Sequence, residues 1–290
     1  MSADQSKSAK TWTILDIVNW ATSYFQEKNI ESPRLKIELI LCHLLKINRV
    51  EVYSKFDRPL SPVELDTLRN MVKRVANHEP IQYIIGKVQF CDIELNVNES
   101  VLIPRPETEQ LVQIILEKYN NKTGLNILDI GSGSGCIGLT LAKNNPLSSV
   151  VCIDKSEAAI EVAKSNVEKN SIENVTFLSL DVSMSLKVDK FDIIVSNPPY
   201  IEIEEYNKLD AEVLNYEPRI SLTDEGNGLK FYGIFAEKFR YILKDSGEFF
   251  LEFGFGQRES LEEIFESSIY KIKFENDFSG LPRFLIGSLK

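Results

Sequence analysis

The feature that most restricts the fold of this chain is a glycine-rich loop set between an apolar run and a helix-forming run. LNILDI covers residues 125–130, GSGSG covers 131–135, and CIGL follows directly. Glycine tolerates positive φ and lets the backbone come close to a ligand, while free N–H groups at a helix start attract a carboxylate or phosphate. A buried strand, a tight turn and a helix in this order predict a nucleotide-type cofactor site in an α/β sheet.

Strand and helix patterns keep alternating after this loop. Helical patterns follow the glycines, begin again at Ser156, and recur at about 229–243 and 257–267. We therefore predict an α/β fold with a doubly wound, mostly parallel sheet whose ligands lie at the carboxyl ends of the strands. The runs typical of strands are 125–130, 149–154, 175–180, 191–196, 247–253 and 283–289.

The first eighty residues carry helical patterns with clear start signals. Thr13 with Asp16 has the spacing of a capping box, and Ser32 and Ser61 each stand before a proline at a first helical position. A small helical bundle is the economical interpretation of this region.

Between these two regions the pattern changes to short alternating runs. Residues 82–103, QYIIGKVQFCDIELNVNESVLI, hold apolar runs separated by turn-forming residues, which indicates strands or a hairpin. We expect a helical domain over residues 1–80, a β-hairpin linker over 81–104 and an α/β domain over 105–290.

Composition narrows the class of partner. The formal net charge is −10 and the pI is about 5.0, which argues against a surface built to bind a nucleic-acid backbone. Four widely spaced cysteines and two histidines give no readable metal site. No run of about 18 uncharged apolar residues is present, and MSADQSKSAK has no apolar signal core, so we expect a cytoplasmic protein without a membrane span.

The residues around the glycines indicate which cofactor binds. Gly133, Gly135 and Gly138 also satisfy the G-x-G-x-x-G dinucleotide fingerprint, so NAD stays open, as does a turn that only lets strand and helix pack. Asp129, two positions before Gly131, would repel a pyrophosphate but attract the ammonium group of a methionine moiety, so S-adenosylmethionine fits better. The loop residues expected to hold it are Gly131, Ser132, Gly133, Ser134 and Gly135.

Two further aspartates stand at predicted strand ends. Asp154 ends SVVCID, 25 residues after Asp129, where a carboxylate can accept hydrogen bonds from both ribose hydroxyls. Alternatively, it caps the helix that begins at Ser156. Asp181, after VTFLSL, can accept from the adenine amino group, although aspartates often simply begin loops.

The segment FDIIVSNPPYIE, residues 191–202, ends a buried-looking strand with two prolines. Pro199 forces Pro198, and Pro198 forces Asn197, away from helical backbone angles, so the chain leaves the strand as a stiff, extended loop. Both prolines lack an N–H donor. The Pro198 carbonyl and the Asn197 carboxamide oxygen can therefore act as two fixed acceptors for one NH₂ group.

Such a pair of acceptors meets a chemical need. An amide nitrogen is a poor nucleophile because its lone pair is delocalised into a π-system. If each oxygen takes one N–H, the nitrogen can pyramidalise toward a methyl sulfonium, and stabilisation that grows toward the transition state accelerates transfer. Tyr200 can stack on the planar acceptor group. The alternative is that NPPY is only a turn at the end of a strand.

Taken together, these residues resemble the glutamine N5-methyltransferases that modify peptide chain release factors, often called the HemK or PrmC family. The resemblance spans nearly the whole chain, through EPIQYIIGKVQF, VLIPRPETEQLV, LDIGSGSGCIGL, IVSNPPYI, NYEPRISL and DEGNGLKFY in that order. IPRPETE beside NPPY is its specific part, since NPPY alone is shared with enzymes that methylate amino groups of DNA and RNA.

The resemblance implies a helical N-terminal domain that docks the release factor and a class I methyltransferase domain that receives the glutamine of its GGQ loop. It assigns Gly131 to Gly135 and Asp154 to S-adenosylmethionine, whose product is S-adenosylhomocysteine. It assigns Asn197 to Tyr200 to the glutamine amide, with Asn197, Pro198 and Tyr200 in the catalytic roles. The expected protein is a monomer that needs no metal.

Other residues complete the expected site. Asp129, Asp181, Val182 and Asn197 belong to the cofactor set, and Val182 stands where this family often has an aromatic residue, which leaves the packing of the adenine at that edge open. Arg105, Glu107 and Thr108 of IPRPETE are expected to shape the acceptor pocket, or their charges pair within the loop.

Three other functions stay open at this point. An amino-methyltransferase acting on nucleic acid could use the same acceptor pair, although the acidic balance and the missing basic-aromatic stretch weigh against it. An NAD-dependent oxidoreductase could use GSGCIG. A non-catalytic interaction protein could keep the cofactor fold.

Overall fold

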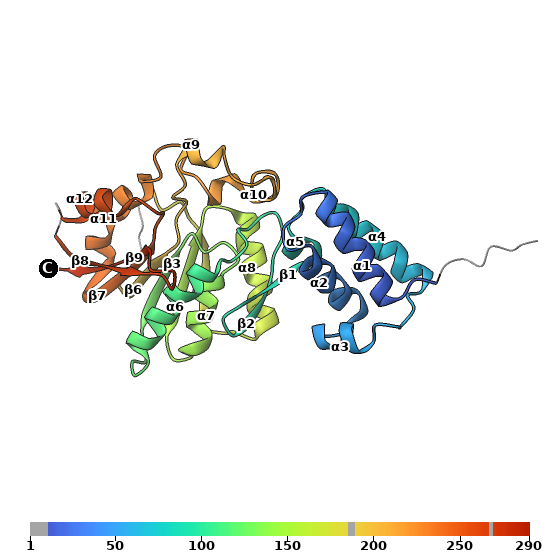
Figure 1. The fold of residues 1–290 in the computed structure, drawn as a ribbon. Coiled ribbons are helices and arrows are strands. Elements are labelled where there is room, and N and C mark those ends of the chain that lie inside the picture. The colour runs from blue at the N-terminus through green and yellow to red at the C-terminus, as the bar shows by residue number, and fades with distance from the viewer. Residues whose placement is uncertain (1–10, 185–188, 267–268) are drawn as a thin grey trace, which may run out of the picture. The chain divides into compact units, whose positions relative to one another are not determined.

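The computed structural model describes residues 11–184, 189–266 and 269–290, which form two compact units that divide between Ile85 and Gly86 (Figure 1). The first ten residues of the predicted helical segment lie outside the described residues. Among the helices of the described residues, none is both long and apolar enough to span a bilayer.

The first unit is helical, as predicted. Thr13 and Asp16 form a reciprocal capping box at the start of its first helix, and Ser61 does the same at the start of its fourth. Ser32 also precedes a helix, but it adopts left-handed angles and its side chain caps no N–H group. The helices are α1 (Ile14–Glu27), α2 (Pro33–Leu45), α3 (Arg49–Ser54), α4 (Pro62–Ala76) and α5 (Ile81–Ile85).

Helix α5 is a correction to the predicted hairpin, which began at residue 81. Ile81 and Ile84 lie three positions apart and are buried in the apolar core of the first unit, which a helix allows and a strand would not. The hairpin itself is shorter, with β1 (Lys87–Phe90) antiparallel to β2 (Ile93–Asn96).

The second unit is built on a seven-stranded sheet in the order β5-β4-β3-β6-β7-β9-β8. The five strands from β5 to β7 are parallel, and β9 is antiparallel to both of its neighbours. Strand β8 was not predicted. The strands are β3 (Asn126–Ile130), β4 (Ser149–Asp154), β5 (Val175–Ser179), β6 (Phe191–Ser196), β7 (Leu243–Glu252), β8 (Tyr270–Asn276) and β9 (Pro282–Leu289).

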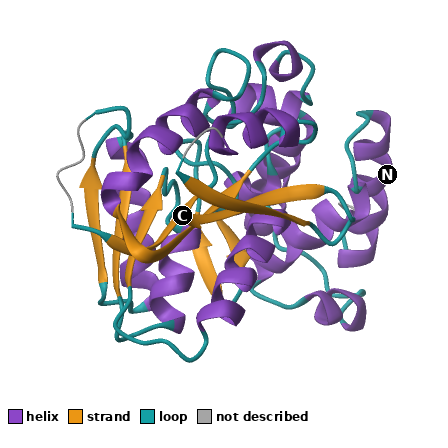
Figure 2. Cartoon of the chain, turned by 90° about the vertical axis from the view of Figure 1, so that its left-hand side faces the viewer, coloured by secondary structure: helices purple, strands orange, loops and turns teal. Residues whose placement is uncertain are grey.

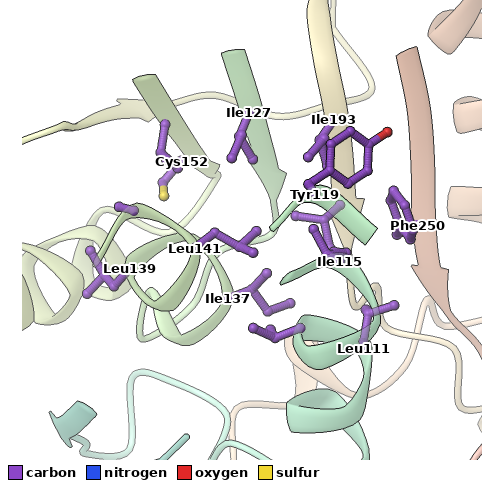
Figure 3. Close-up of a cluster of buried hydrophobic side chains, with 14 of the residues drawn as sticks. Leu111, Ile115, Tyr119, Ile127, Ile137, Leu139, Leu141, Cys152, Ile193 and Phe250 are labelled. Carbon is purple, nitrogen blue, oxygen red and sulfur yellow. The ribbon is translucent and has the colours of Figure 1, made fainter. Parts of the chain in front are cut away.

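Helices cover both faces of this sheet (Figure 2). On one face lie α6 (Pro106–Tyr119), α7 (Cys136–Asn144) and α8 (Glu157–Asn170), and Figure 3 shows how Leu111 and Ile137 pack toward Ile127, Ile193 and Phe250 of the strands. On the other face lie α11 (Lys230–Ile242) and α12 (Arg258–Glu266). The short elements α9 (Ile203–Tyr206), α10 (Ala211–Tyr216) and the 3₁₀ turn Arg219–Ser221 follow β6.

Strand β3 is the point at which the chain order of the sheet reverses. Its partners are β4 on one side and β6 on the other. Helix α7, which follows β3, and helix α11, which lies between β6 and β7, cover opposite faces of the sheet. The loops that leave β3 and β6 therefore separate and open a crevice at the carboxyl ends of these strands, where doubly wound sheets bind their ligands.

Candidate active site

A cavity lies at the carboxyl ends of β3, β4, β5 and β6. It contains about 780 Å³ of empty space, including the part that opens to solvent, which is the size of a site for a small molecule. We call it the cofactor cavity. The predicted cofactor residues that line it are Gly131, Gly133, Asp154, Asp181, Val182 and Asn197.

The glycine loop forms one wall of the cofactor cavity. Gly131, Gly133 and Gly135 all have positive φ, which explains why glycine occupies these positions. A Cβ atom added to Gly131 or Gly133 would meet no heavy atom within 4 Å, so the space beside the loop is open. Ser132, Ser134 and Gly135 do not line the cavity.

Asp154 links the end of β4 to this loop. Its Oδ2 accepts a hydrogen bond from the backbone N–H of Gly133 at 2.9 Å, and its Oδ1 accepts from Ser156 N at 2.9 Å. Each oxygen of a carboxylate has two lone pairs, so each keeps one for a further donor. The carboxylate therefore fixes the loop and still faces the cavity as an acceptor.

The structure does not bring Asp129 to the cofactor cavity. Its side chain is fully buried beneath α7, where Oδ2 accepts from Gly138 N at 2.9 Å. Burial raises the pKa of Asp129 to about 7. Because Asp129 alternates with Leu128 and Ile130 along β3, it faces α7 together with Ile127.

The far end of the cofactor cavity is largely apolar. Val182 is buried there, and Asp181 beside it accepts from Ser183 N at 2.8 Å. The hydrogen bonds from Ser183 lower the pKa of Asp181. Position 182 carries no aromatic residue, but Phe231 and Phe235 on α11 bring aromatic side chains to the cavity. Ile153 and Leu180 complete its apolar lining.

A second cavity, of about 480 Å³ of empty space, adjoins the first. We call it the acceptor cavity. It is lined by Arg105, Tyr200 and the residues around α10, and it shares Leu102, Asn197, Pro198 and Ser221 with the cofactor cavity. Asn197 and Pro198 thus stand at the boundary between two cavities. Pro199 lines only the cofactor cavity, and Glu107 lines neither.

The described residues leave the two predicted acceptor oxygens without a hydrogen-bond donor. Asn197 donates through Nδ2 to Thr108 Oγ1 at 3.0 Å. Within the described part of the chain, no N–H or O–H group donates to Asn197 Oδ1 or to the Pro198 carbonyl oxygen. Both oxygens therefore keep their capacity to accept hydrogen bonds, and both residues line the two cavities.

Contacts from distant segments hold the NPPY loop. The Tyr200 hydroxyl donates to Glu252 Oε1 at 3.1 Å, and the Tyr200 carbonyl accepts from Gln257 Nε2 at 2.9 Å. Burial raises the pKa of Tyr200, so this group stays a phenol. Gly228 passes so close that an added Cβ would lie 2.1 Å from the Tyr200 carbonyl oxygen.

Arg105 is held by an acidic residue that sequence analysis missed. Its Nη2 lies 2.6 Å from Oε1 of Glu217, and Oε2 of Glu217 accepts from Ile103 N at 3.2 Å. Glu217 is buried, so this pair fixes the IPRPETE segment against the segment after α10.

Glu252, at the end of β7, was also missed. A charged residue inside the apolar run GEFFLEF was the available signal, because a buried carboxylate needs partners. Phe231 and Phe235 were also missed, since their spacing on α11 reads as ordinary helix packing. Among the described residues, no group of three histidine, cysteine, aspartate or glutamate side chains could hold a metal ion.

Comparison with known proteins agrees with this architecture. Residues 16–86 match the family described as PrmC N-terminal domain, and residues 107–227 match the Methyltransferase small domain family. A methyltransferase of known structure from Pyrococcus furiosus aligns with a TM-score of 0.52 and 18% identity, covering 75% of this chain and 97% of that one. Together with the strand order, this likeness confirms the predicted class I methyltransferase fold.

Two relatives named release factor glutamine methyltransferase match over most of their length. The release factor glutamine methyltransferase of Geobacter sulfurreducens is 37% identical over 98% of this chain and 99% of its own. That of Thermodesulfovibrio yellowstonii is 39% identical over 85% of this chain and 89% of its own.

Proposed function

This chain belongs to the release factor glutamine methyltransferase family, and we propose that it transfers a methyl group from S-adenosylmethionine to the side-chain amide nitrogen of the GGQ glutamine in peptide chain release factors. The observation that carries the proposal is the position of Asn197 and Pro198. Both residues line a cavity suited to the cofactor and an adjoining cavity suited to the acceptor, and among the described residues none donates to their side-chain or carbonyl oxygens.

The residues of the cofactor cavity fit S-adenosylmethionine. Open space beside Gly131 and Gly133 admits the methionine part, and the Asp154 carboxylate keeps lone pairs for the ribose hydroxyls. The apolar far end, with Val182 and Phe231, suits the adenine ring. When bound, this cofactor supplies a methyl group on a positively charged sulfur and leaves as S-adenosylhomocysteine.

Asn197 and Pro198 prepare the acceptor. The glutamine amide enters through the acceptor cavity, and its two N–H groups donate to Asn197 Oδ1 and to the Pro198 carbonyl oxygen. The nitrogen then rehybridises, so its lone pair points toward the cofactor cavity. Because these oxygens are fixed in advance, they stabilise the developing positive charge on nitrogen without reorganisation. The methylated nitrogen is acidic and releases its proton to solvent, so no strong base and no metal are needed.

Tyr200 and Arg105 line the cavity that receives the glutamine. The ring of Tyr200 is held at its hydroxyl by Glu252 and can stack on the planar amide. The guanidinium of Arg105 keeps donors beyond those used by Glu217 and can bind carbonyl groups of the GGQ loop. Both residues act by orienting the acceptor.

The rest of the proposal concerns the whole protein. We propose that the helical segment, residues 1–80, docks the release factor, that residues 81–104 link it to the catalytic domain, and that residues 105–290 carry out transfer. We propose a cytoplasmic monomer whose substrate is a protein, because a net charge of −10 disfavours a nucleic-acid substrate.

The direct test is methylation of a recombinant release factor. The chain, the release factor and S-adenosylmethionine with an isotopically labelled methyl group are incubated, and peptide mass spectrometry locates the label. We expect one methyl group on the GGQ glutamine, and no label in a release factor in which this glutamine is replaced by asparagine. Label in added RNA or DNA, or none in the release factor, would overturn the proposal.

A further inference from the structure

A line of buried polar groups runs from the acceptor boundary into the protein. Asn197 Nδ2 donates to Thr108 Oγ1 at 3.0 Å, and the Thr108 hydroxyl donates to Glu252 Oε2 at 2.7 Å. The other oxygen of Glu252 accepts from the Tyr200 hydroxyl at 3.1 Å. Thr108 is 2% exposed and Glu252 is 1% exposed, so water does not compete for these bonds.

The carboxylate end of this line fixes the direction of every bond in it. An ionised carboxylate can only accept hydrogen bonds, so the Thr108 hydroxyl must donate its single hydrogen to Glu252. The Thr108 oxygen is then left with lone pairs only. It can satisfy Asn197 only by accepting from the NH₂ end of the carboxamide, which turns Asn197 Oδ1 the other way.

The orientation of Asn197 matters because its carboxamide is nearly symmetric in shape. Rotation by 180° exchanges oxygen and NH₂ at almost no steric cost. With the NH₂ end turned toward the cavities, Asn197 would present a donor to the two donors of a glutamine amide. No hydrogen bond would form, and the acceptor would lose one of its two contacts.

On the basis of the proposed function, we propose that Glu252 is a positioning residue that acts through Thr108 to keep Oδ1 of Asn197, and not its NH₂ group, turned toward the acceptor amide. Glu252 itself touches neither cavity. The same carboxylate fixes the Tyr200 hydroxyl, so one buried anion orients both side chains that receive the glutamine.

The charges around Glu252 predict how this role depends on pH. Burial raises the pKa of Glu252 to about 7, opposed by the hydrogen bonds from Thr108 and Tyr200 and by Arg283 on β9, and reinforced by Glu107 on α6. Tyr232 on α11 also faces it and donates to its backbone carbonyl at 2.8 Å. Once protonated, Glu252 can donate to Thr108, and the direction of the line is no longer imposed.

The activity test uses single-turnover rates of methyl transfer to a release factor. Thr108→Val keeps the shape but removes the hydroxyl, and we expect a rate about tenfold lower, or ~1.4 kcal/mol, with cofactor affinity unchanged. Thr108→Ser restores the hydroxyl and should restore the rate. Thr140→Val is the matched control, because Thr140 is also buried, its hydroxyl donates to the Cys136 carbonyl within α7, and it lines neither cavity.

Glu252→Gln tests the anion itself. The glutamine NH₂ group can donate to Thr108 and reverse the line, so the rate should fall by about tenfold, and its rise through about pH 7 should disappear. In the double variant with Thr108→Val, the loss of rate should not exceed that of either single variant, because both changes affect Asn197 through the same hydrogen bond of Thr108. Additive losses, or a rate with Thr108→Val equal to that of the control, would overturn the inference.

Neutron diffraction from deuterated crystals of the unliganded chain gives a readout that does not require activity. We expect deuterium on the Asn197 nitrogen that points at Thr108, and deuterium of Thr108 directed at Glu252. The opposite orientation would overturn the inference by itself. If this orientation is seen but the wild-type chain methylates no release factor, the proposed function fails and the orientation stands.

Discussion

At the scale of single residues, a change at Asn197 distinguishes an effect on methyl transfer from an effect on cofactor binding. Asn197→Ala removes one of the two acceptors for the glutamine amide and leaves the glycine loop and Asp154 intact. We predict a single-turnover rate lower by ~10²-fold, the scale for losing one preorganised polar contact, with a much smaller change in the affinity for S-adenosylmethionine. Asn145→Ala is the control, because the Asn145 amide bonds a helix carbonyl and lines neither cavity. An Asn197→Ala rate equal to that of the control would contradict the prediction.

Sequence analysis predicted the site residues at the ends of strands, but not the distant residues that hold them by hydrogen bonds. Asn197 and Asp154 could be placed at the cofactor cavity because parallel strands bring their carboxyl ends to one edge of the sheet. Asp129 stands only two residues before the loop, yet the two-residue period of the strand turns it beneath α7. Glu252 lies 144 residues from Thr108, and no local pattern predicts such a partner.

At the scale of elements, the close contact of α7 with the sheet depends on Gly138. A Cβ added there would lie 2.4 Å from Cys152 Sγ on β4 and 3.0 Å from Asp129 Oδ2 on β3. Gly138→Ala should therefore lower the free energy of unfolding by about 1–3 kcal/mol, because the helix must move away from both strands.

A second helical glycine provides the matched control for this prediction. Gly233 lies in α11, and an added Cβ would meet no heavy atom within 4 Å. Gly233→Ala should raise the free energy of unfolding by about 0.5–1 kcal/mol, since alanine is the better helix former. Urea unfolding of both variants measures the contrast, and a similar effect of the two changes would show that α7 does not need the close contact.

The inner strands of the sheet could be predicted from sequence, but the edge strand β8 could not. The inner parallel strands β4, β3, β6 and β7 contain apolar runs because helices cover both faces of the sheet there. Strand β8 lies at the edge, and its lysines at 271 and 273 weaken the apolar signal. Residues 81–85 read as strand because their helical period is visible only once the core of the first unit supplies the partners.

At the scale of the whole molecule, buried carboxyl groups link stability to pH. The pKa of Asp129 rises from 3.8 to about 7 on burial, so its contribution to stability is fully present below about pH 4 and is lost as the pH rises through 7. Asp129→Asn removes this dependence. Between about pH 5 and pH 8, wild-type stability should therefore fall relative to this variant by about 1–3 kcal/mol.

Urea unfolding of the wild type and of Asp129→Asn at these two pH values measures the difference between their free energies of unfolding. The titration of all other groups cancels in this difference. Asp245→Asn serves as the control for replacing an aspartate by asparagine, because the Asp245 side chain is 98% exposed. If the Asp129→Asn difference stays constant with pH, Asp129 titrates in the folded protein as it does in the unfolded chain.

The central claim is that two fixed oxygens at the boundary between the cavities take both hydrogens of the acceptor amide. The most direct measurement is a crystal structure of the chain with S-adenosylhomocysteine and a GGQ-containing release factor. We predict that the glutamine amide nitrogen lies about 2.7–3.2 Å from both Asn197 Oδ1 and the Pro198 carbonyl oxygen. A glutamine bound elsewhere, or an Asn197 that turns its NH₂ group toward it, would contradict the account.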